Sequence, residues 1–177
     1  MSEVSERYAK IADGFTTRLE GVSPDQWSAP TPCTEWTARD LVGHVIATHR
    51  RVMAALDGTE PAPVNPAADH MQDWATAKGA VGEALDDRSK ATQTVSGIFG
   101  EQPFESLVGR LLCTDTLIHT WDLARGTGQQ EDLDPTAVMT AMEFLTPIDD
   151  AIRDHRSCAR ARPSRRRAHG YCRGAES

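Results

Sequence analysis

The chain has 177 residues, of which 39% are hydrophobic and 25% charged, and its net charge is -7 at neutral pH. This length fits one domain with a substantial core, and the negative charge argues against nucleic acid as a partner. No apolar run approaches the roughly 20 residues of a membrane span, and no apolar signal core follows the charged N-terminus, so we expect no membrane insertion and a cytoplasmic location. Four dispersed cysteines without a CxxC pair indicate reduced thiols.

The apolar residues recur at helical spacing over most of the chain. Five predicted helices cover about residues 3–19, 37–58, 69–86, 103–126 and 134–148. Residues 90–103 are compatible with either a short extended piece or a loop, and no convincing alternation typical of a strand is present. We therefore predict an all-α fold over residues 1–152, an up-and-down four-helix bundle with longer crossovers and an additional C-terminal helix region.

Polar residues mark the starts of three of these helices. Thr37 with Asp40 resembles a capping box, in which each of two residues satisfies a backbone N–H near the other. Asp69 is the expected cap of the third helix. Asp134 followed by Pro135 combines a cap with the residue that suits a first helical turn. These signals predict where the second, third and fifth helices begin.

Residues 153–177 have a different character. Eight arginines stand against one aspartate and one glutamate, so this segment carries +6 and residues 1–152 carry -13. With almost no aliphatic residues, the segment cannot bury a hydrophobic face, which predicts little order. Three interpretations remain open: a basic arm for an anionic partner, a solvated tail, or the out-of-frame translation of a GC-rich gene. Translating the coding DNA in its other frames tests the third.

One face of the fourth predicted helix carries Asp115, His119 and Asp122, at spacings of four and three. Burying such a face is unfavourable unless it is neutralised, and a divalent metal could do this. Asp115 and His119 can share one ion, and the third ligand must come from another helix. His44, on the apolar side of the second helix, is the natural partner. The alternative, which spacing alone favours, is a core histidine at 44 with a hydrogen-bonded ring and an ion pair between Asp115 and an arginine such as Arg110.

Other polar and aromatic residues near these positions have two interpretations each. Asp122 either orients a metal ligand or its water, or pairs with Arg125. Cys33 is either a reactive thiol or a small buried apolar residue, and the second is favoured. We expect Cys113 to be structural and Trp36 to pack over the start of the second helix.

The segments 31–44 (TPCTEWTARDLVGH) and 115–125 (DTLIHTWDLAR), followed by a Thr-Gly pair, resemble the actinobacterial proteins related to the metal-binding domain of mycothiol-dependent maleylpyruvate isomerase. These proteins belong to the DinB-like/YfiT-like superfamily of helical bundles. The resemblance covers about residues 3–150 and implies that His44, Asp115 and His119 bind a divalent ion, zinc or nickel. Asp115 stands where the isomerase has glutamate, which puts the isomerase substrate in doubt. The apolar ending of the family is replaced by the arginine-rich segment.

An ion with three protein ligands and open positions supplies Lewis-acid chemistry. The resemblance therefore implies a metal-dependent transferase or isomerase that joins a low-molecular-weight thiol, mycothiol, to a small electrophile. Two alternatives remain: a hydrolase in which the metal activates water, and a non-enzymatic metal- or ligand-binding module. We expect a small-molecule substrate, and a homodimer is compatible with the sequence.

Overall fold

The structure, a computed structural model, describes residues 2–148. Its elements in chain order are α1 (Glu3–Glu20), a 3-10 turn (Gln26–Ser28), α2 (Ala38–Asp57), α3 (His70–Asp86), α4 (Arg88–Ala91), β1 (Thr94–Gly97), β2 (Gly100–Pro103), α5 (Phe104–Leu107), a π-helical segment (Val108–Leu112), α6 (Cys113–Gly126), α7 (Pro135–Leu145) and a 3-10 turn (Thr146–Ile148). The predicted domain end at 152 and the arginine-rich segment 153–177, with its three interpretations, lie outside the described residues. Between residues 2 and 148, none of the helices is both long and apolar enough to cross a membrane.

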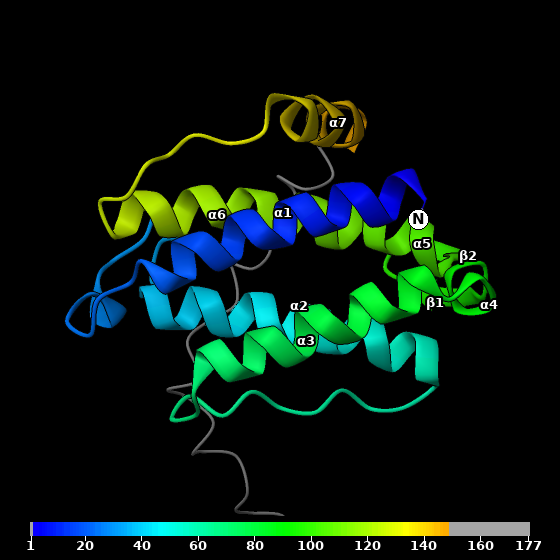
Figure 1. Cartoon of the computed structure of the whole chain (residues 1–177), viewed down its shortest axis with the longest axis horizontal. Helices are drawn as coiled ribbons and strands as arrows, with labels where there is room; N and C mark the ends of the chain where they lie inside the picture. The colour runs from blue at the N-terminus through cyan, green and yellow to red at the C-terminus, as the bar shows by residue number, and fades with distance from the viewer. Residues whose placement is uncertain (1, 149–177) are drawn as a thin grey trace, which may run out of the picture. The chain divides into compact units, whose positions relative to one another are not determined.

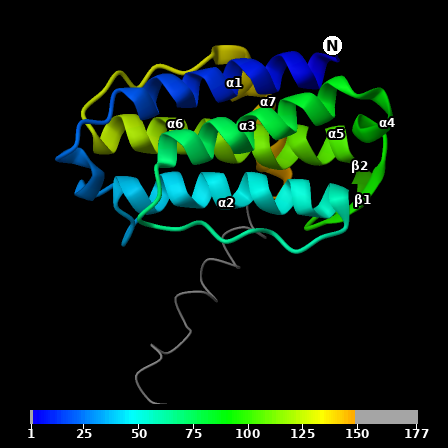
Figure 2. The same cartoon turned by 60° about the horizontal axis from the view of Figure 1, so that its bottom comes forward.

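Four long helices form the bundle (Figures 1 and 2). α1 packs against α6 and α3, and α2 packs against α3 and α6. α1 and α2 run in opposite directions, whereas α2 and α3 run in the same direction because the loop between them returns along the length of the bundle (Figure 1). The predicted all-α, DinB-like bundle with a long crossover is therefore confirmed. The bundle lies in a compact unit that spans Met1–Ala141, and a second unit begins at Met142.

The predicted helix starts are confirmed by their caps. The Thr37 hydroxyl accepts a hydrogen bond from the Asp40 N–H, and the Asp40 carboxylate accepts one from the Thr37 N–H, which completes the capping box of α2. The Asp69 carboxylate accepts the first free N–H groups of α3, and Asp134 accepts from the third residue of α7 at 2.8 Å. Gly58 ends α2 at φ +65°, a left-handed conformation that glycine adopts without strain.

Two features of residues 90–126 were not predicted. β1 and β2 pair as an antiparallel hairpin with Thr94 opposite Pro103, where the sequence left an extended piece or a loop open. The fourth predicted helix is continuous from Phe104 to Gly126, but its turn at Val108–Leu112 is π-helical. A π-helical turn inside an α-helix accommodates one extra residue and is frequent at functional sites. It directly precedes the residues of the predicted metal site.

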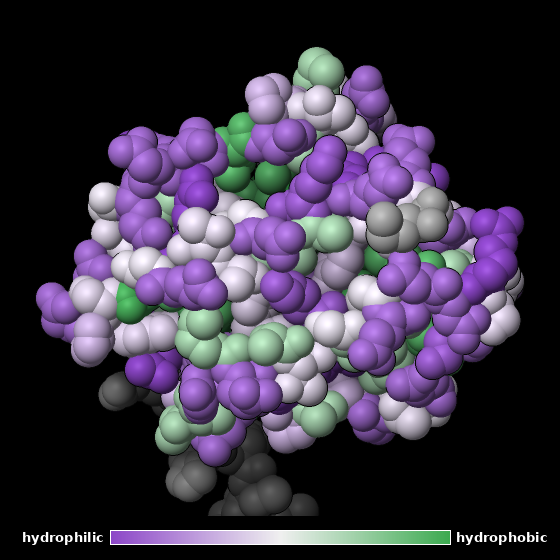
Figure 3. Space-filling model, in the orientation of Figure 1, coloured by the Kyte–Doolittle hydropathy of each residue, from purple (hydrophilic) through white to green (hydrophobic). Residues whose placement is uncertain are grey.

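The core lies between the four long helices. Its largest fully buried side chains include Trp74, Phe15, Phe104, Leu19, Leu41 and Ile46. The face shown in Figure 3 is mostly hydrophilic, with small separate hydrophobic areas. The apolar residues that define the helical pattern are therefore largely internal, and they fix how α2 and α6 face each other.

Candidate metal centre

The structure brings together the three predicted metal ligands from two helices. His44 lies on α2, and Asp115 and His119 lie one turn apart on α6. The Asp115 Oδ1 atom is 3.2 Å from His44 Nε2 and 3.5 Å from His119 Nε2. The two imidazole rings stand nearly perpendicular, with centroids 5.0 Å apart. The donor atoms of all three side chains therefore converge on one point between α2 and α6, while metal binding itself stays a prediction.

Asp115 is the central group of this cluster. Its ion pairs within residues 2–148 are with the two histidines, and none is with an arginine such as Arg110, the kind of partner that the alternative interpretation predicted. Its second oxygen, Oδ2, is buried and has no hydrogen-bond partner in the described part of the chain. A buried carboxylate oxygen without a partner is unfavourable. The oxygen that faces both histidine nitrogens is Oδ1, so Oδ2 would be satisfied only by a cation that the carboxylate binds through both oxygens.

The protonation of the cluster follows from its contacts. Burial disfavours the charged form of Asp115, but hydrogen bonds and the charges of His119 and His44 outweigh it and hold the pKa of this carboxyl well below its usual range. Burial also disfavours the charged form of His119, but Asp115 and Asp122 outweigh it and raise the pKa of His119 to about 9. The site thus favours a carboxylate beside a positively charged group, which is the charge arrangement that a metal ion would provide.

Asp122 holds the other nitrogen of His119. Its Oδ2 atom lies 3.0 Å from His119 Nδ1, and because a carboxylate only accepts, the Nδ1–H donates and leaves Nε2 facing Asp115. Asp122 is 4% exposed. Arg125, the other predicted partner, pairs instead with Glu131 at 3.2 Å. Asp122 therefore orients the ring, as carboxylates commonly do for metal-binding histidines.

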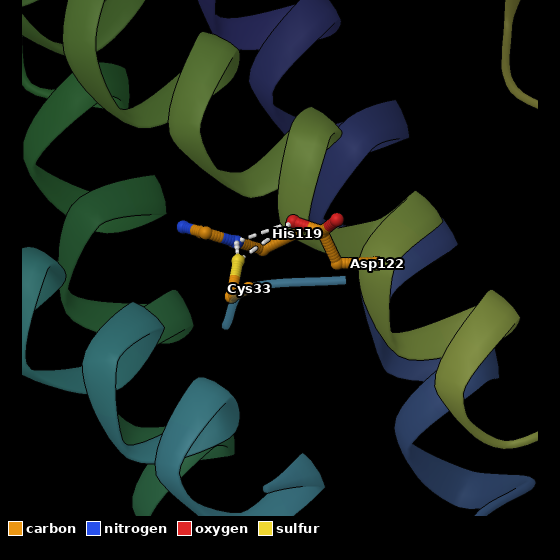
Figure 4. Close-up of side chains that lie close together, drawn as sticks. All are labelled: Cys33, His119 and Asp122. Carbon is orange, nitrogen blue, oxygen red and sulfur yellow. Dashed lines mark hydrogen bonds and ion pairs between the residues drawn. The ribbon is translucent and has the colours of Figure 1, made fainter. Parts of the chain in front are cut away.

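Cys33 reaches the same carboxylate from the turn that precedes α2 (Figure 4). Its thiol donates to Asp122 Oδ2 at 3.3 Å, and its Sγ atom is 3.9 Å from His119 Nδ1. The sequence favoured a small buried apolar role for this residue, but the structure places its sulfur in a polar contact beside a predicted ligand. The turn that carries it is irregular, with Glu35 at φ +76°. Apolar periodicity could not have predicted this approach.

Trp36 covers the two histidines rather than only the helix start. Its ring centroid is 4.7 Å from that of His44 and 5.9 Å from that of His119. It is partly buried and packs against the core. An indole at this position limits water access to the rings and fixes their orientation. In the sequence, its contact with the histidines was indicated only by its position in the segment that also contains Cys33 and His44.

His49, on the same helix as His44, is a core histidine. It is fully buried, its Nδ1 atom is 2.9 Å from the Val45 carbonyl oxygen, and its ring contacts the edge of Trp74. Burial is the largest effect on this group, and it lowers the pKa of His49 to about 4. The ring is therefore neutral at physiological pH and part of the packing.

A hollow of about 490 Å³ lies between α1, α6 and the loop before α7. From α6 it is lined by Leu117 and Thr120. These positions lie on the opposite face of the helix from Asp115 and His119, given about 100° of rotation per residue. This hollow is separate from the candidate metal centre.

The sequence is similar to one described family and to two other proteins. Residues 8–124, which include all three predicted ligands, match the family described as Mycothiol maleylpyruvate isomerase N-terminal domain. Two uncharacterized proteins of Mycobacterium tuberculosis, from strains CDC 1551 / Oshkosh and ATCC 25618 / H37Rv, are each 33% identical over 169 residues, which cover 88% of this chain and 89% of theirs. No solved structure matches significantly. The chain therefore belongs to the mycothiol maleylpyruvate isomerase N-terminal domain family.

Proposed function

We propose that the chain binds a divalent ion, zinc or nickel, through His44, Asp115 and His119 and acts on a low-molecular-weight thiol such as mycothiol, as a transferase or isomerase with a small electrophile. The observation that supports this most directly is the convergence of two imidazole nitrogens on one carboxylate oxygen, Asp115 Oδ1. Family membership supports the thiol.

The spacing of the donors suits such an ion. In a four-coordinate zinc site with bonds of about 2.0–2.1 Å, neighbouring nitrogen and oxygen donors lie roughly 3.3 Å apart. The two measured separations, 3.2 Å from Asp115 Oδ1 to His44 Nε2 and 3.5 Å to His119 Nε2, differ from this by a few tenths of an ångström. All three donor atoms lie within 4.8 Å of one another, which is compatible with an adjustment of the side chains around one ion.

Three protein ligands leave a coordination position for a small molecule, and a bound divalent ion lowers the pKa of a thiol or water placed there. The chain's own groups position this site. Asp122 keeps the proton of His119 on Nδ1, so that Nε2 presents its lone pair. Trp36 packs over both rings and limits access of water. With His119 Nδ1 and the Cys33 thiol both donating to it, Asp122 is poorly placed to serve as a general base, which disfavours the hydrolase.

Metal analysis of purified protein, dialysed against metal-free buffer, tests the ligand assignment. We expect about one tightly bound ion per chain to survive dialysis in the wild type and little tightly bound metal in His44→Ala and His119→Ala. His70→Gln is the matched control, because His70 lies at the start of α3 and contacts Trp27 rather than the cluster. Unchanged metal content in both ligand variants would disprove the site.

An activity measurement tests the chemistry separately. The wild type should consume monochlorobimane only when mycothiol is present, and a chelator should abolish the reaction until zinc or nickel is restored. Turnover of hydrolysable substrates without thiol would instead indicate a hydrolase. Stoichiometric metal without either reaction would indicate a binding module.

A further inference from the structure

A second set of donors lies on the opposite side of the His119 ring. His119 Nδ1, Asp122 Oδ2 and Cys33 Sγ lie within 3.9 Å of one another: 3.0 Å from nitrogen to oxygen, 3.3 Å from sulfur to oxygen and 3.9 Å from sulfur to nitrogen. Figure 4 shows the three side chains meeting, two from α6 and one from the turn before α2. None of the three atoms is among those facing the His44 side of the cluster.

We propose that Cys33, Asp122 and His119 Nδ1 form a second cation position, which takes a zinc-like divalent ion and shares His119 with the first. Thiolate, imidazole and carboxylate together are a ligand set that zinc accepts. The proposal requires only the orientation of the His119 ring and does not depend on the thiol chemistry proposed above.

The distances fit an ion of this size. With bonds of about 2.3 Å to sulfur and about 2.0–2.1 Å to nitrogen and oxygen, a tetrahedral site separates nitrogen from oxygen by roughly 3.3 Å and sulfur from either by roughly 3.6 Å. The measured values of 3.0, 3.3 and 3.9 Å lie within about 0.4 Å of these. Each difference is small enough for a change of side-chain torsion alone, and the backbone can stay in place.

Ion binding leaves the net charge of the cluster unchanged. A divalent ion that enters this position adds two positive charges and displaces two protons, one from the Cys33 thiol and one from His119 Nδ1. Asp122, which is 4% exposed, therefore has a positive neighbour both before the ion enters, when this is His119, and afterwards, when this is the ion. Because two hydrogen bonds to Asp122 are lost on entry, this position is the weaker one and fills after the first.

Titration with Co²⁺ tests the proposal, because a cobalt–thiolate bond has a charge-transfer absorption in the near ultraviolet. The starting protein carries Cys158→Ser and Cys172→Ser, which removes the two other thiols that lie outside the described residues. We expect two equivalents of cobalt, with the thiolate absorption appearing during the second. Cys33→Ala in this background should bind one equivalent without the absorption. Cys113→Ala, the matched control with a buried thiol in the core, should behave like the starting protein.

One further variant separates this position from the first. His44→Ala should lose the first equivalent and keep the second with its thiolate absorption, whereas His119→Ala should lose both. Absence of the absorption throughout the titration of the starting protein would overturn the proposal. So would an unchanged stoichiometry in Cys33→Ala. Neither result would affect the assignment of His44 and Asp115 to the first position.

Discussion

Raising the pH of the chelator-treated protein from 6.5 to 9 should destabilise it, and His119 should account for most of the loss. Burial disfavours its charged form, but the contacts with Asp115 and Asp122 prevail and raise its pKa from the ordinary 6.5 to about 9. A group whose pKa is higher in the folded state adds stability below its unfolded pKa and loses that contribution as the pH rises through the folded value. Each pKa unit corresponds to about 1.4 kcal/mol. The whole contribution is therefore at most about 3–4 kcal/mol, of which about 2–3 kcal/mol disappears between pH 6.5 and 9.

Urea unfolding at several pH values in this range measures the effect, with His119→Gln as the matched variant. Glutamine keeps a polar side chain but cannot carry the charge, so the variant should show a much flatter pH dependence. Burial also raises the pKa of Tyr8 and of Cys113. Both groups therefore add to the loss of stability at alkaline pH, equally in the wild type and in the variant. The difference between the two proteins isolates His119. Equal pH dependence of the two unfolding free energies would refute the reasoning.

Two further observations belong to the same experiment. Saturating zinc should remove the alkaline loss, because the ion and the proton compete for His119. His49 acts in the opposite direction: its pKa, lowered to about 4 by burial, gives a contribution that is present above pH 6.5 and lost as the pH falls through 4. The stability of the chelator-treated protein should therefore be greatest near pH 6.5.

Two other predictions follow from the site. Zinc at about 100 times its dissociation constant should add about 2.7 kcal/mol to the free energy of unfolding. For a chain of this size this corresponds to a rise of roughly 5–10 °C in the melting temperature, which scanning fluorimetry measures. An unchanged melting temperature with demonstrated metal binding would contradict the prediction. Trp36→Ala should weaken metal affinity about tenfold, because the His44 and His119 rings lose the indole that packs on them. Competition with a chromophoric chelator measures the affinity, and a value equal to that of the wild type would show that the indole does not support the ligands.

Much of the fold could be predicted because its determinants are local. The caps at Thr37, Asp69 and Asp134 fix helix starts within one turn of chain, and apolar spacing gives the faces that pack. The hairpin of β1 and β2 could not be predicted in this way, since each strand has four residues and only alternate positions can be buried. A stretch so short carries too little pattern to separate a strand from a loop.

The same distinction between local and tertiary determinants applies to the candidate site. Asp115 and His119 could be paired from their spacing on one helix, and the position of His44 on an apolar face, with the resemblance, indicated the third residue. The contacts of Cys33 depend on the path of an irregular turn and on the side chain that α6 presents to it. Both are tertiary facts, so the sequence could place the residue near the second helix but not beside Asp122.

The π-helical turn at Val108–Leu112 explains how one helix can support both the core and the candidate metal site. A stripe of fully buried residues runs along it, with successive spacings of four, four, four and seven: Phe104, Val108, Leu112, Thr116 and Leu123. At about 100° per residue, twelve residues of regular α-helix would turn Thr116 by roughly 120° away from Phe104. One residue accommodated in the π-helical turn reduces this to roughly 20°, so the stripe stays in the core. Asp115 then lies about 100° from the stripe, at the edge of the core where α6 meets α2 and where its carboxylate reaches His44.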